Sequence, residues 1–339
     1  MAGPIAVLGS GAWGTALAAH CRRGGSVVRQ WAREPEVAEE IRHGENRTFL
    51  PGVPLPPGVD ATTDLAAVVE GAEIVLAVVP SQFAREVYRR LAGSLPNDLP
   101  LVAAAKGIEE RSLMLPIEVI HDELGATRPV AVLSGPSFAS DMAQGKPTAL
   151  VAAAEDPALA DRLQARLASA ELRIYTNGDP VGVQLGGALK NVIALAAGIL
   201  DGLGTGPNGR AALITRGLAE MTRLGIRLGG NPATFAGLAG LGDLVLTCTG
   251  DQSRNLTVGR RLGRGESLDL ILDGATAVAE GIRTAGSAHR LAEREAVRMP
   301  IVEEVNRVLY EGCDPRDAIQ RLMGRPLTSE DETPEILPR

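Results

Sequence analysis

The sequence predicts an α/β domain built on a mainly parallel β-sheet, followed by an all-helical domain. Three observations support this fold class. Short apolar segments alternate with helical stretches in the first half of the chain, and a glycine-rich motif directly follows the first of these segments. From about Val181 to Met323, long stretches of Ala, Leu and Gly continue without strand signals. Short strands that alternate with helices are typical of βαβ units in a parallel sheet.

The first predicted strand covers residues 4–8 (PIAVL), and a helix is expected from about Thr15 to Arg23. The further segments that we interpret as strands cover residues 26–32, 73–79, 99–105, 129–133, 148–154 and 172–176. Each is short and apolar, as is typical of strands in a parallel sheet. The last residues of the chain, RPLTSEDETPEILPR, are polar and contain proline, which predicts a loose tail.

The motif GSGAWG at residues 9–14 lies between the first strand and its helix. In this setting G-x-G-x-x-G is a dinucleotide-binding signature, because the glycines let the backbone approach a pyrophosphate at the helix N-terminus. A tight turn without a ligand is the alternative. We therefore expect a dinucleotide-binding, Rossmann-like domain in residues 1–180, a helical substrate and catalytic domain in residues 181–325, and a loose polar tail in residues 326–339.

The end of the second predicted strand bears on the choice of cofactor. An NAD site commonly places an acidic residue there, bonded to the ribose 2′-hydroxyl, whereas an arginine accommodates the 2′-phosphate of NADP. Here Arg33 comes first and Glu34 follows it. The order favours NADP(H) and leaves NAD(H) possible. The alternative is that Arg33 is an exposed cation at a helix start.

Composition excludes several classes of protein. A net charge of −7 over 339 residues, without a basic stripe, argues against a nucleic-acid-binding surface. Cys21, Cys248 and Cys313 are odd in number and widely spaced, so we expect neither a disulfide framework nor a metal site. The chain begins directly with a strand pattern, and no apolar run approaches the ~20 residues of a membrane helix. We expect a cytoplasmic protein that acts on a small molecule and forms a homodimer.

Lysine is scarce in this chain: among the 34 lysines and arginines, only Lys106, Lys146 and Lys190 are lysines. An arginine keeps its proton in proteins, whereas a lysine can release one when its pKa is lowered. Lys106 and Lys190 lie among apolar and small residues, which favours functional roles. The alternative is an apolar stem with its charged head in water. Lys146 lies in a predicted turn, where we expect no function. The histidines lie in none of the motifs, so acid–base chemistry is expected of a lysine.

Other polar residues gather where predicted strands end. Lys106 ends one strand, and residues 135–139 (GPSFA) follow another. Ligands of open α/β sheets bind beyond these carboxyl ends. In the helical half, Asp243 stands among apolar residues, where a carboxylate needs a partner. Residues 253–255 (SRN) precede a predicted helix and could grip a phosphate with helix N–H groups and a guanidinium. A simple helix cap is the alternative.

Taken together, these segments resemble the bacterial type of NAD(P)-dependent glycerol-3-phosphate dehydrogenase. The resemblance is carried by GSGAWGTALA, NRTFLPGV, AAAKGIE, LSGPSFA, ALKNVIALAAGILDGLGTGPNGRAALITRGLAEM, GLAGLGDLVLTCTGDQSRN and AEGIRT. These segments occur in the family's order over about residues 4–325. The resemblance implies hydride transfer between NAD(P)H and dihydroxyacetone phosphate. The product, sn-glycerol 3-phosphate, supplies the backbone for glycerophospholipid synthesis.

The resemblance also implies roles for individual residues. The cofactor contacts are Gly9, Gly11, Ala12, Trp13, Gly14, Arg33, Phe49, Lys106, Ala139, Arg254, Val278 and Glu280. The substrate contacts are Lys106, Gly135, Ser137, Lys190, Asp243, Ser253, Arg254 and Asn255. Lys190 is implied to be the proton donor and acceptor, supported by Asp243 and Thr247. Two positions depart from the family: Ala12 stands where serine is frequent, and Phe49 where tyrosine is common.

The expected mechanism is hydride transfer to the C2 carbonyl, with Lys190 protonating the developing alkoxide. An unperturbed lysine titrates near pH ~10.4, whereas an effective general acid works closer to neutrality. Burial and the charge of Lys106 would lower the pKa of Lys190, and Asp243 would raise it. The sequence leaves that balance open. Two alternatives remain at this stage: a related helical-domain dehydrogenase of a hydroxyacyl-CoA or sugar acid, and a non-catalytic NADP(H)-binding sensor.

Overall fold

The computed structural model describes residues 3–273, 279–327 and 329–330. The chain forms two compact units. The first consists of Met1–Lys106 and Met114–Pro180, and the second of Gly107–Leu113 and Val181–Arg339. The segment Gly107–Leu113 therefore groups with the second unit, whereas the division expected from the sequence keeps it in the first. Most of the expected tail lies outside the described residues.

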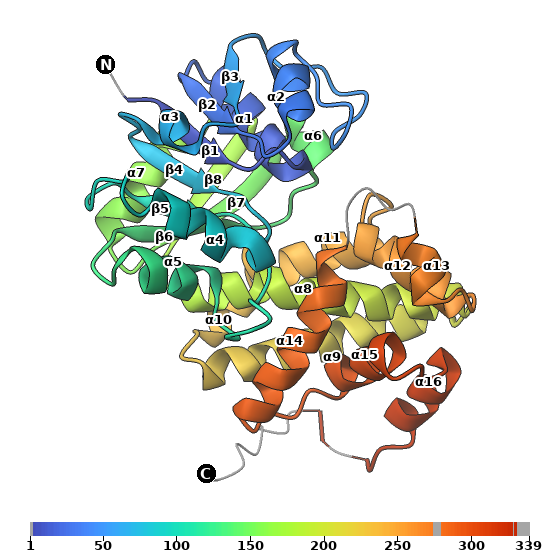
Figure 1. Cartoon of the computed structure of the whole chain (residues 1–339). Coiled ribbons are helices and arrows are strands. Elements are labelled where there is room, and N and C mark those ends of the chain that lie inside the picture. The colour runs from blue at the N-terminus through green and yellow to red at the C-terminus, as the bar shows by residue number, and fades with distance from the viewer. Residues whose placement is uncertain (1–2, 274–278, 328, 331–339) are drawn as a thin grey trace. The chain divides into compact units, whose positions relative to one another are not determined.

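The first unit is built on a sheet whose described strands have the order β3-β2-β1-β4-β5-β6-β7-β8 (Figure 1). All neighbours pair in parallel except β6 and β7, which are antiparallel. The strands are β1 (Ile5–Leu8), β2 (Val28–Trp31), β3 (Val59–Thr62), β4 (Ile74–Ala77), β5 (Leu101–Ala103), β6 (Val130–Ser134), β7 (Thr148–Ala153) and β8 (Leu172–Asn177). The predicted mainly parallel sheet is thus confirmed. The first six positions follow the order of doubly wound dinucleotide-binding folds.

Helices cover both faces of this sheet (Figure 1). They are α1 (Ala12–Arg23), α2 (Pro35–Arg42), α3 (Leu65–Val69), α4 (Ser81–Leu91), α5 (Pro116–Leu124), α6 (Ala139–Ala143) and α7 (Pro157–Leu167). Successive side chains of β1 point to opposite faces of the sheet and so belong to different hydrophobic cores. Ile5 and Val7 join the core beneath α1, α2, α6 and α7, and Ala6 and Leu8 join the core beneath α3, α4 and α5. This double burial explains why β1 and β4 are wholly apolar.

Two details of the first unit differ from the sequence prediction. The sequence does not predict β3, because its segment VDAT is short and half polar. Val59 and Ala61 are buried while Asp60 is exposed. The helix expected from about Thr15 begins at Ala12, so the second half of the glycine motif forms its first turn. The loop between β1 and α1 is therefore shorter than the sequence suggests.

The secondary-structure elements described in the second unit are all helices, which confirms the predicted class (Figure 1). Its helices are α8 (Pro180–Gly202), α9 (Gly206–Arg227), α10 (Pro232–Phe235), α11 (Asp243–Thr249), α12 (Arg254–Gly263), α13 (Leu268–Leu272), α14 (Glu280–Arg294), α15 (Pro300–Tyr310) and α16 (Pro315–Met323). A π-helical turn, η1 (Leu238–Gly242), directly precedes α11.

The central element of this unit is α8. Its residues 182–199 are all buried and most of them are apolar, as is typical of a helix in a protein core. Contrary to the sequence expectation, α8 and the stretch Pro232–Thr249 are long and apolar enough to be membrane-span candidates by length and composition. The candidate window of α8 is 94% buried inside the protein, and that of the second stretch is 44% buried. Such burial explains the apolar sequence of α8 by core packing.

Candidate functional site

Two glycines of the motif occupy positions where a side chain would not fit. Gly9 adopts a φ of +121°, which L side chains rarely adopt. A Cβ on Gly14 would lie 2.3 Å from the Gly9 carbonyl oxygen, so a side chain there would collide with the backbone. By contrast, a Cβ on Gly11 would meet no atom within 4 Å. The first and third glycines thus serve the turn and its packing, and the second leaves an open approach to the N-terminus of α1.

That N-terminus suits an anion. The residue before α1, Gly11, makes no side-chain cap, and the first turn contains no acidic residue. The first N–H groups of a helix have no intrahelical partner, and the helix dipole favours negative charge there. Ala12 and Trp13 lie in this first turn. The observed cradle therefore fits the pyrophosphate of a dinucleotide.

A buried polar network that the sequence did not reveal supports the loop. Asn46 is fully buried, and its Nδ2 donates to the Ser10 carbonyl and to Thr15 Oγ1, both at 2.8 Å. Its Oδ1 accepts from the Phe49 backbone N–H at 2.9 Å. Gln30 Nε2 donates to the Gly9 carbonyl at 2.9 Å. The segment NRTFLPGV contains Asn46, but no local pattern indicates that its side chain reaches the glycine loop.

The predicted cofactor residues Trp13, Phe49 and Ala139 all pack, partly buried, against one core of the first unit. The Trp13 indole Nε1 also donates to the Ala104 carbonyl at 3.1 Å. This bond ties the first turn of α1 to the chain that follows β5. Trp13 and Ala139 are therefore held on α1 and α6, and Phe49 lies in a turn after α2, where its backbone N–H bonds to Asn46.

Arg33 lies just beyond β2 with a side chain that is 70% exposed. Its Nε and Nη2 donate to the same Glu34 carboxylate oxygen, at 2.8 and 2.5 Å. An exposed ion pair of this kind contributes little to stability, so either partner can exchange it for another contact. The Arg33 side chain can therefore turn toward an anionic group of a bound ligand. The Glu34 carboxylate lies at the end of β2, where it could accept a hydrogen bond from a ribose hydroxyl.

Lys106, Gly135 and Ser137 come together beyond the carboxyl ends of β5 and β6. Lys106 Nζ donates to the Gly135 carbonyl at 3.2 Å, and Ser137 Oγ donates to the same oxygen at 3.1 Å. Gly135 adopts a φ of +136°, and a Cβ there would lie 3.2 Å from the Ala149 carbonyl oxygen. The strained turn thus gathers an ammonium and a hydroxyl at one carbonyl. Both are groups that bind oxygen-rich substrates.

In the second unit, Lys190 of α8 meets Asp243 and Thr247 of α11. Lys190 Nζ lies 2.5 Å from Asp243 Oδ1 and donates to Thr247 Oγ1 at 2.8 Å. The Lys190 side chain is 8% exposed and that of Asp243 is fully buried. Thr247 Oγ1 in turn donates to the Asp243 main-chain carbonyl at 2.6 Å. The partner that a buried carboxylate requires is therefore Lys190, and all three predicted catalytic residues form one cluster.

The segment Ser253-Arg254-Asn255 begins α12. The Ser253 hydroxyl oxygen accepts from the Leu256 N–H at 3.2 Å. Ser253 is therefore a helix cap, as the alternative from the sequence states. Asn255 is buried, donates to Asn191 Oδ1 at 3.0 Å, and accepts from the Gly281 N–H at 3.0 Å. The asparagine pair joins α12 to α8 and α14. The sequence did not indicate that Asn191, next to Lys190, is the partner of Asn255.

Arg254 is exposed and borders a pocket of about 340 Å³. The pocket is lined by Asp251, Gln252, Arg254, Thr257, Val258, Ile271, Leu272 and Ala279. Glu280 is the first residue of α14 and follows the pocket residue Ala279. Val278 lies outside the described residues. Arg254 and Glu280 are thus placed at helix starts in one region of the second unit.

Several other titratable residues take no part in these clusters. Lys146 is exposed and pairs with Asp141 at 2.6 Å, as a surface lysine would. Burial raises the pKa of the Cys248 thiol to about 12, which keeps it protonated and unreactive at neutral pH. Within residues 3–273, 279–327 and 329–330, no group of three His, Cys, Asp or Glu side chains could hold a metal ion.

Comparisons with known proteins cover nearly the whole chain. Residues 4–160 match the model of the NAD-dependent glycerol-3-phosphate dehydrogenase N-terminus, and residues 179–320 match that of its C-terminus. The chain is 52% identical over 329 residues to the glycerol-3-phosphate dehydrogenase (NAD(P)+) of Geobacter sulfurreducens, covering 96% of this chain and 98% of that protein. The corresponding Koribacter versatilis protein is 50% identical over 332 residues, covering 96% and 98%. The crystal structure of the Coxiella burnetii glycerol-3-phosphate dehydrogenase has a TM-score of 0.91 at 42% identity, covering 96% of this chain and 99% of that one.

Proposed function

The chain belongs to the family of NAD-dependent glycerol-3-phosphate dehydrogenases, and on that basis we propose the part that each described residue plays in the reaction. It is an NAD(P)-dependent oxidoreductase that transfers a hydride between NAD(P)H and dihydroxyacetone phosphate and forms sn-glycerol 3-phosphate. The product supplies the backbone for glycerophospholipid synthesis. The family and function predicted from the sequence are confirmed. The alternative of a hydroxyacyl-CoA or sugar-acid dehydrogenase is not favoured, nor is a non-catalytic sensor.

The first unit holds the cofactor in this proposal. The open backbone at Gly11 and the uncapped start of α1 take the pyrophosphate, because their N–H groups point to the place where the anion lies. Trp13, Phe49 and Ala139 supply apolar contact surface beside it. When bound, the nicotinamide ring supplies the hydride. Arg33 leaves its ion pair with Glu34 and binds the 2′-phosphate of NADP(H) instead. When NAD(H) binds, the Glu34 carboxylate accepts from the ribose 2′-hydroxyl.

Two sets of residues bind the substrate in this proposal. Lys106 and Ser137 recognise its oxygens, since both already converge on the Gly135 carbonyl. Ser253, Arg254 and Asn255 hold the phosphate: the start of α12 offers N–H groups and Arg254 offers a guanidinium. Arg254 also contacts the cofactor, as do Val278 and Glu280. A bidentate arginine is the usual partner of a phosphate in proteins, which supports the assignment of Arg254.

The single observation that carries the proposed mechanism is the buried Lys190–Asp243–Thr247 cluster. An ammonium has three N–H donors. Those of Lys190 meet Asp243 and Thr247, and these two contacts fix the position of its ammonium. Lys190 gives its proton to the oxygen that develops negative charge as the carbonyl is reduced, and takes it back in the reverse direction. Asp243 orients the Lys190 ammonium, and its negative charge compensates the buried positive charge.

We further propose that the protein works in the cytoplasm as a homodimer. The three cysteines carry free thiols, which suits a reducing compartment. The first unit then serves as the dinucleotide-binding domain and the helical unit as the substrate and catalytic domain. Light scattering on the purified protein tests the oligomeric state directly.

The proposed function is tested by following NADPH and NADH oxidation by the purified protein. Dihydroxyacetone phosphate should drive oxidation, whereas unphosphorylated dihydroxyacetone, a 3-oxoacyl-CoA and no substrate should drive little. The reverse reaction should yield NAD(P)H from sn-glycerol 3-phosphate and not from its enantiomer. Faster oxidation with the 3-oxoacyl-CoA than with dihydroxyacetone phosphate would contradict the assignment.

A further inference from the structure

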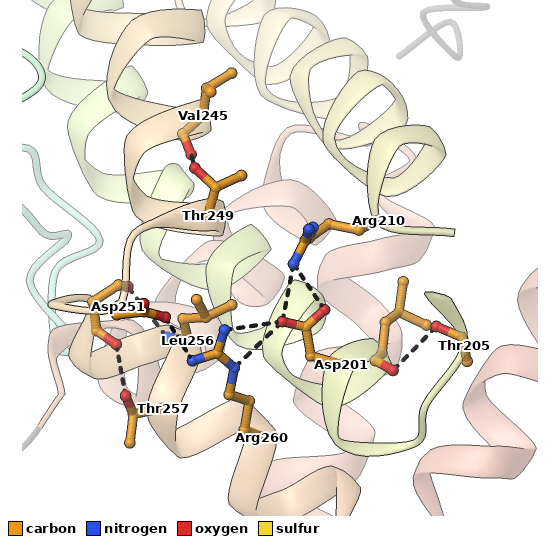
Figure 2. A network of polar contacts seen from close by, with 11 residues as sticks. Asp201, Thr205, Arg210, Val245, Thr249, Asp251, Leu256, Thr257 and Arg260 are labelled. Atoms are coloured by element: carbon orange, nitrogen blue, oxygen red, sulfur yellow. Dashed lines mark hydrogen bonds and ion pairs between the residues drawn. The ribbon is translucent and has the colours of Figure 1, made fainter. Parts of the chain in front are cut away.

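An ionic network joins the C-terminal turn of α8 to α9 and α12 (Figure 2). Asp201 accepts from Arg210 Nη1 at 3.2 Å through each of its two carboxylate oxygens. Its Oδ2 also accepts from Nε and Nη2 of Arg260, at 3.3 and 3.2 Å. The third nitrogen of Arg260, Nη1, donates to Asp251 at 3.2 Å. One guanidinium therefore bridges two carboxylates that belong to different parts of the unit.

The two helices that this bridge connects are in backbone contact. A Cβ on Gly198 of α8 would lie 2.2 Å from the Leu256 carbonyl oxygen, and a Cβ on Gly259 of α12 would lie 2.1 Å from the Leu195 carbonyl oxygen. Such a crossing sets the distance between helices closely. However, two glycine surfaces offer no interlocking side chains against sliding or rotation. A directional contact such as Asp201 with Arg260 supplies that missing constraint, because a guanidinium donates in a fixed planar geometry.

The other end of the bridge lies in the turn that leads into the SRN segment. Asp251 stands between α11, which carries Asp243, and α12, which begins at Arg254. The same turn is closed by Ser253, whose backbone N–H donates to the Gly250 carbonyl at 3.0 Å. The Asp251 side chain is 90% exposed, so its ion pair with Arg260 adds little to folding stability. Its loss should therefore leave the fold intact and release only the restraint on the turn.

We infer that Asp201 and Arg260 are positioning residues, which hold the phosphate-binding segment Ser253-Arg254-Asn255 in place relative to the helix that carries Lys190. This inference rests on the proposed function, in which that segment grips the substrate phosphate. Neither Asp201 nor Arg260 touches the substrate. Arg260 acts through Asp251 on the turn, and Asp201 anchors Arg260 to α8. Weakening the bridge therefore affects phosphate binding before it affects proton transfer at Lys190.

The test is Arg260→Lys, matched with Arg261→Lys on the same helix. Both substitutions keep the charge, so long-range attraction of the phosphate is unchanged. A lysine at 260 has one nitrogen and cannot reproduce the bridge, whereas Arg261 pairs with Glu266 outside it. Because small displacements of binding groups have large kinetic effects, we expect Arg260→Lys to raise KM for dihydroxyacetone phosphate about tenfold and to change kcat less than about twofold. Arg261→Lys should leave both constants near those of the wild type.

Titration calorimetry with inorganic phosphate serves as a second measurement that does not depend on turnover. Arg260→Lys should weaken phosphate binding in parallel with KM, and Asp201→Asn should act in the same direction. Equal phosphate affinity in Arg260→Lys and Arg261→Lys would overturn the inference, as would a lowered kcat and melting temperature with KM unchanged. A protein that fails to reduce dihydroxyacetone phosphate would refute the proposed function. Calorimetry needs no reaction, so the phosphate affinities of Arg260→Lys and Arg261→Lys could still be compared in that case.

Discussion

Lys190 and Asp243 form a buried ion pair, with 2.5 Å between Nζ and Oδ1, although they stand 53 positions apart in the chain. Removing one partner of a buried pair leaves an uncompensated charge, which destabilises a protein by about 3–5 kcal/mol. Truncation of Lys190 would therefore lower the measured activity both by unfolding the protein and by removing the catalytic group. A variant that keeps the positive charge separates the two effects.

Lys190→Arg is that variant. It keeps the charge but removes the transferable proton at ordinary pH. Loss of general acid catalysis typically costs 10²–10⁴-fold, so we expect kcat to fall at least about a hundredfold while NADPH affinity stays nearly unchanged. Steady-state kinetics and NADPH titration measure the two quantities. Lys146→Arg, which alters an exposed lysine paired with Asp141, should be almost silent. Near-normal turnover by a folded Lys190→Arg protein would mean that Lys190 only holds the substrate by charge.

Arg33→Ala tests cofactor selection. Hydrogen bonds to charged groups contribute about 1.5–3 kcal/mol, so NADPH should bind roughly ten- to a hundredfold more weakly. NADH has no 2′-phosphate and should change much less. The loss of the exposed Arg33–Glu34 pair should not alter stability measurably. Fluorescence titration with both cofactors gives the answer, and equal losses for the two would refute the role of Arg33.

Arg254→Ala tests recognition of the substrate phosphate. A guanidinium–phosphate contact of about 1.5–3 kcal/mol implies that KM for dihydroxyacetone phosphate rises at least about tenfold. Unphosphorylated dihydroxyacetone should remain an equally poor substrate, because it never used the contact. Arg254 is exposed, so the variant should fold normally. If the preference for the phosphorylated substrate survives the mutation, the SRN segment is only a helix cap.

Glu220 of α9 predicts a pH dependence of stability. Its carboxylate accepts from the Ile301 and Val302 N–H groups at the start of α15, at 2.8 and 3.3 Å. Burial raises the pKa of Glu220 to about 7, while these bonds and the charges of Arg223 and Arg325 oppose the rise. The folded state thus holds a proton that the unfolded state has lost between its ordinary pKa near 4.5 and about 7. The contribution of Glu220 to the free energy of unfolding therefore declines as pH rises through this window.

Glu220→Gln should remove this decline, since an amide does not titrate and its one oxygen can still accept from a backbone N–H group. At one pKa unit per 1.36 kcal/mol, the variant should gain up to about 3 kcal/mol relative to the wild type between pH ~5 and pH ~8. Urea denaturation of both proteins across this range measures the difference. A stability difference that does not change with pH would show that Glu220 stays ionised in the folded protein.

Local patterns in the sequence were sufficient for the architecture. The apolar runs that became β1 and β4 could be recognised because strands buried on both faces need apolar residues throughout. The motif at residues 9–14 specified its own turn, since Gly9 and Gly14 occupy positions that no side chain can fill. Where the local signal was weak, the prediction failed: the half-polar β3 was missed, and the start of α1 was placed too late.

The sequence by itself determined which residue types are candidates for the proposed chemistry: Lys190 was recognisable because an arginine-rich chain keeps a lysine there. Only the tertiary structure decided what each meets. It pairs Lys190 with Asp243, places Asn46 beneath the glycine turn, and joins Asp201 to Asp251 through Arg260. The physical reason is that local patterns constrain backbone conformation and buried faces, whereas contacts across tens of residues depend on how whole helices pack. A side chain's partner is set by that packing, which no short segment encodes.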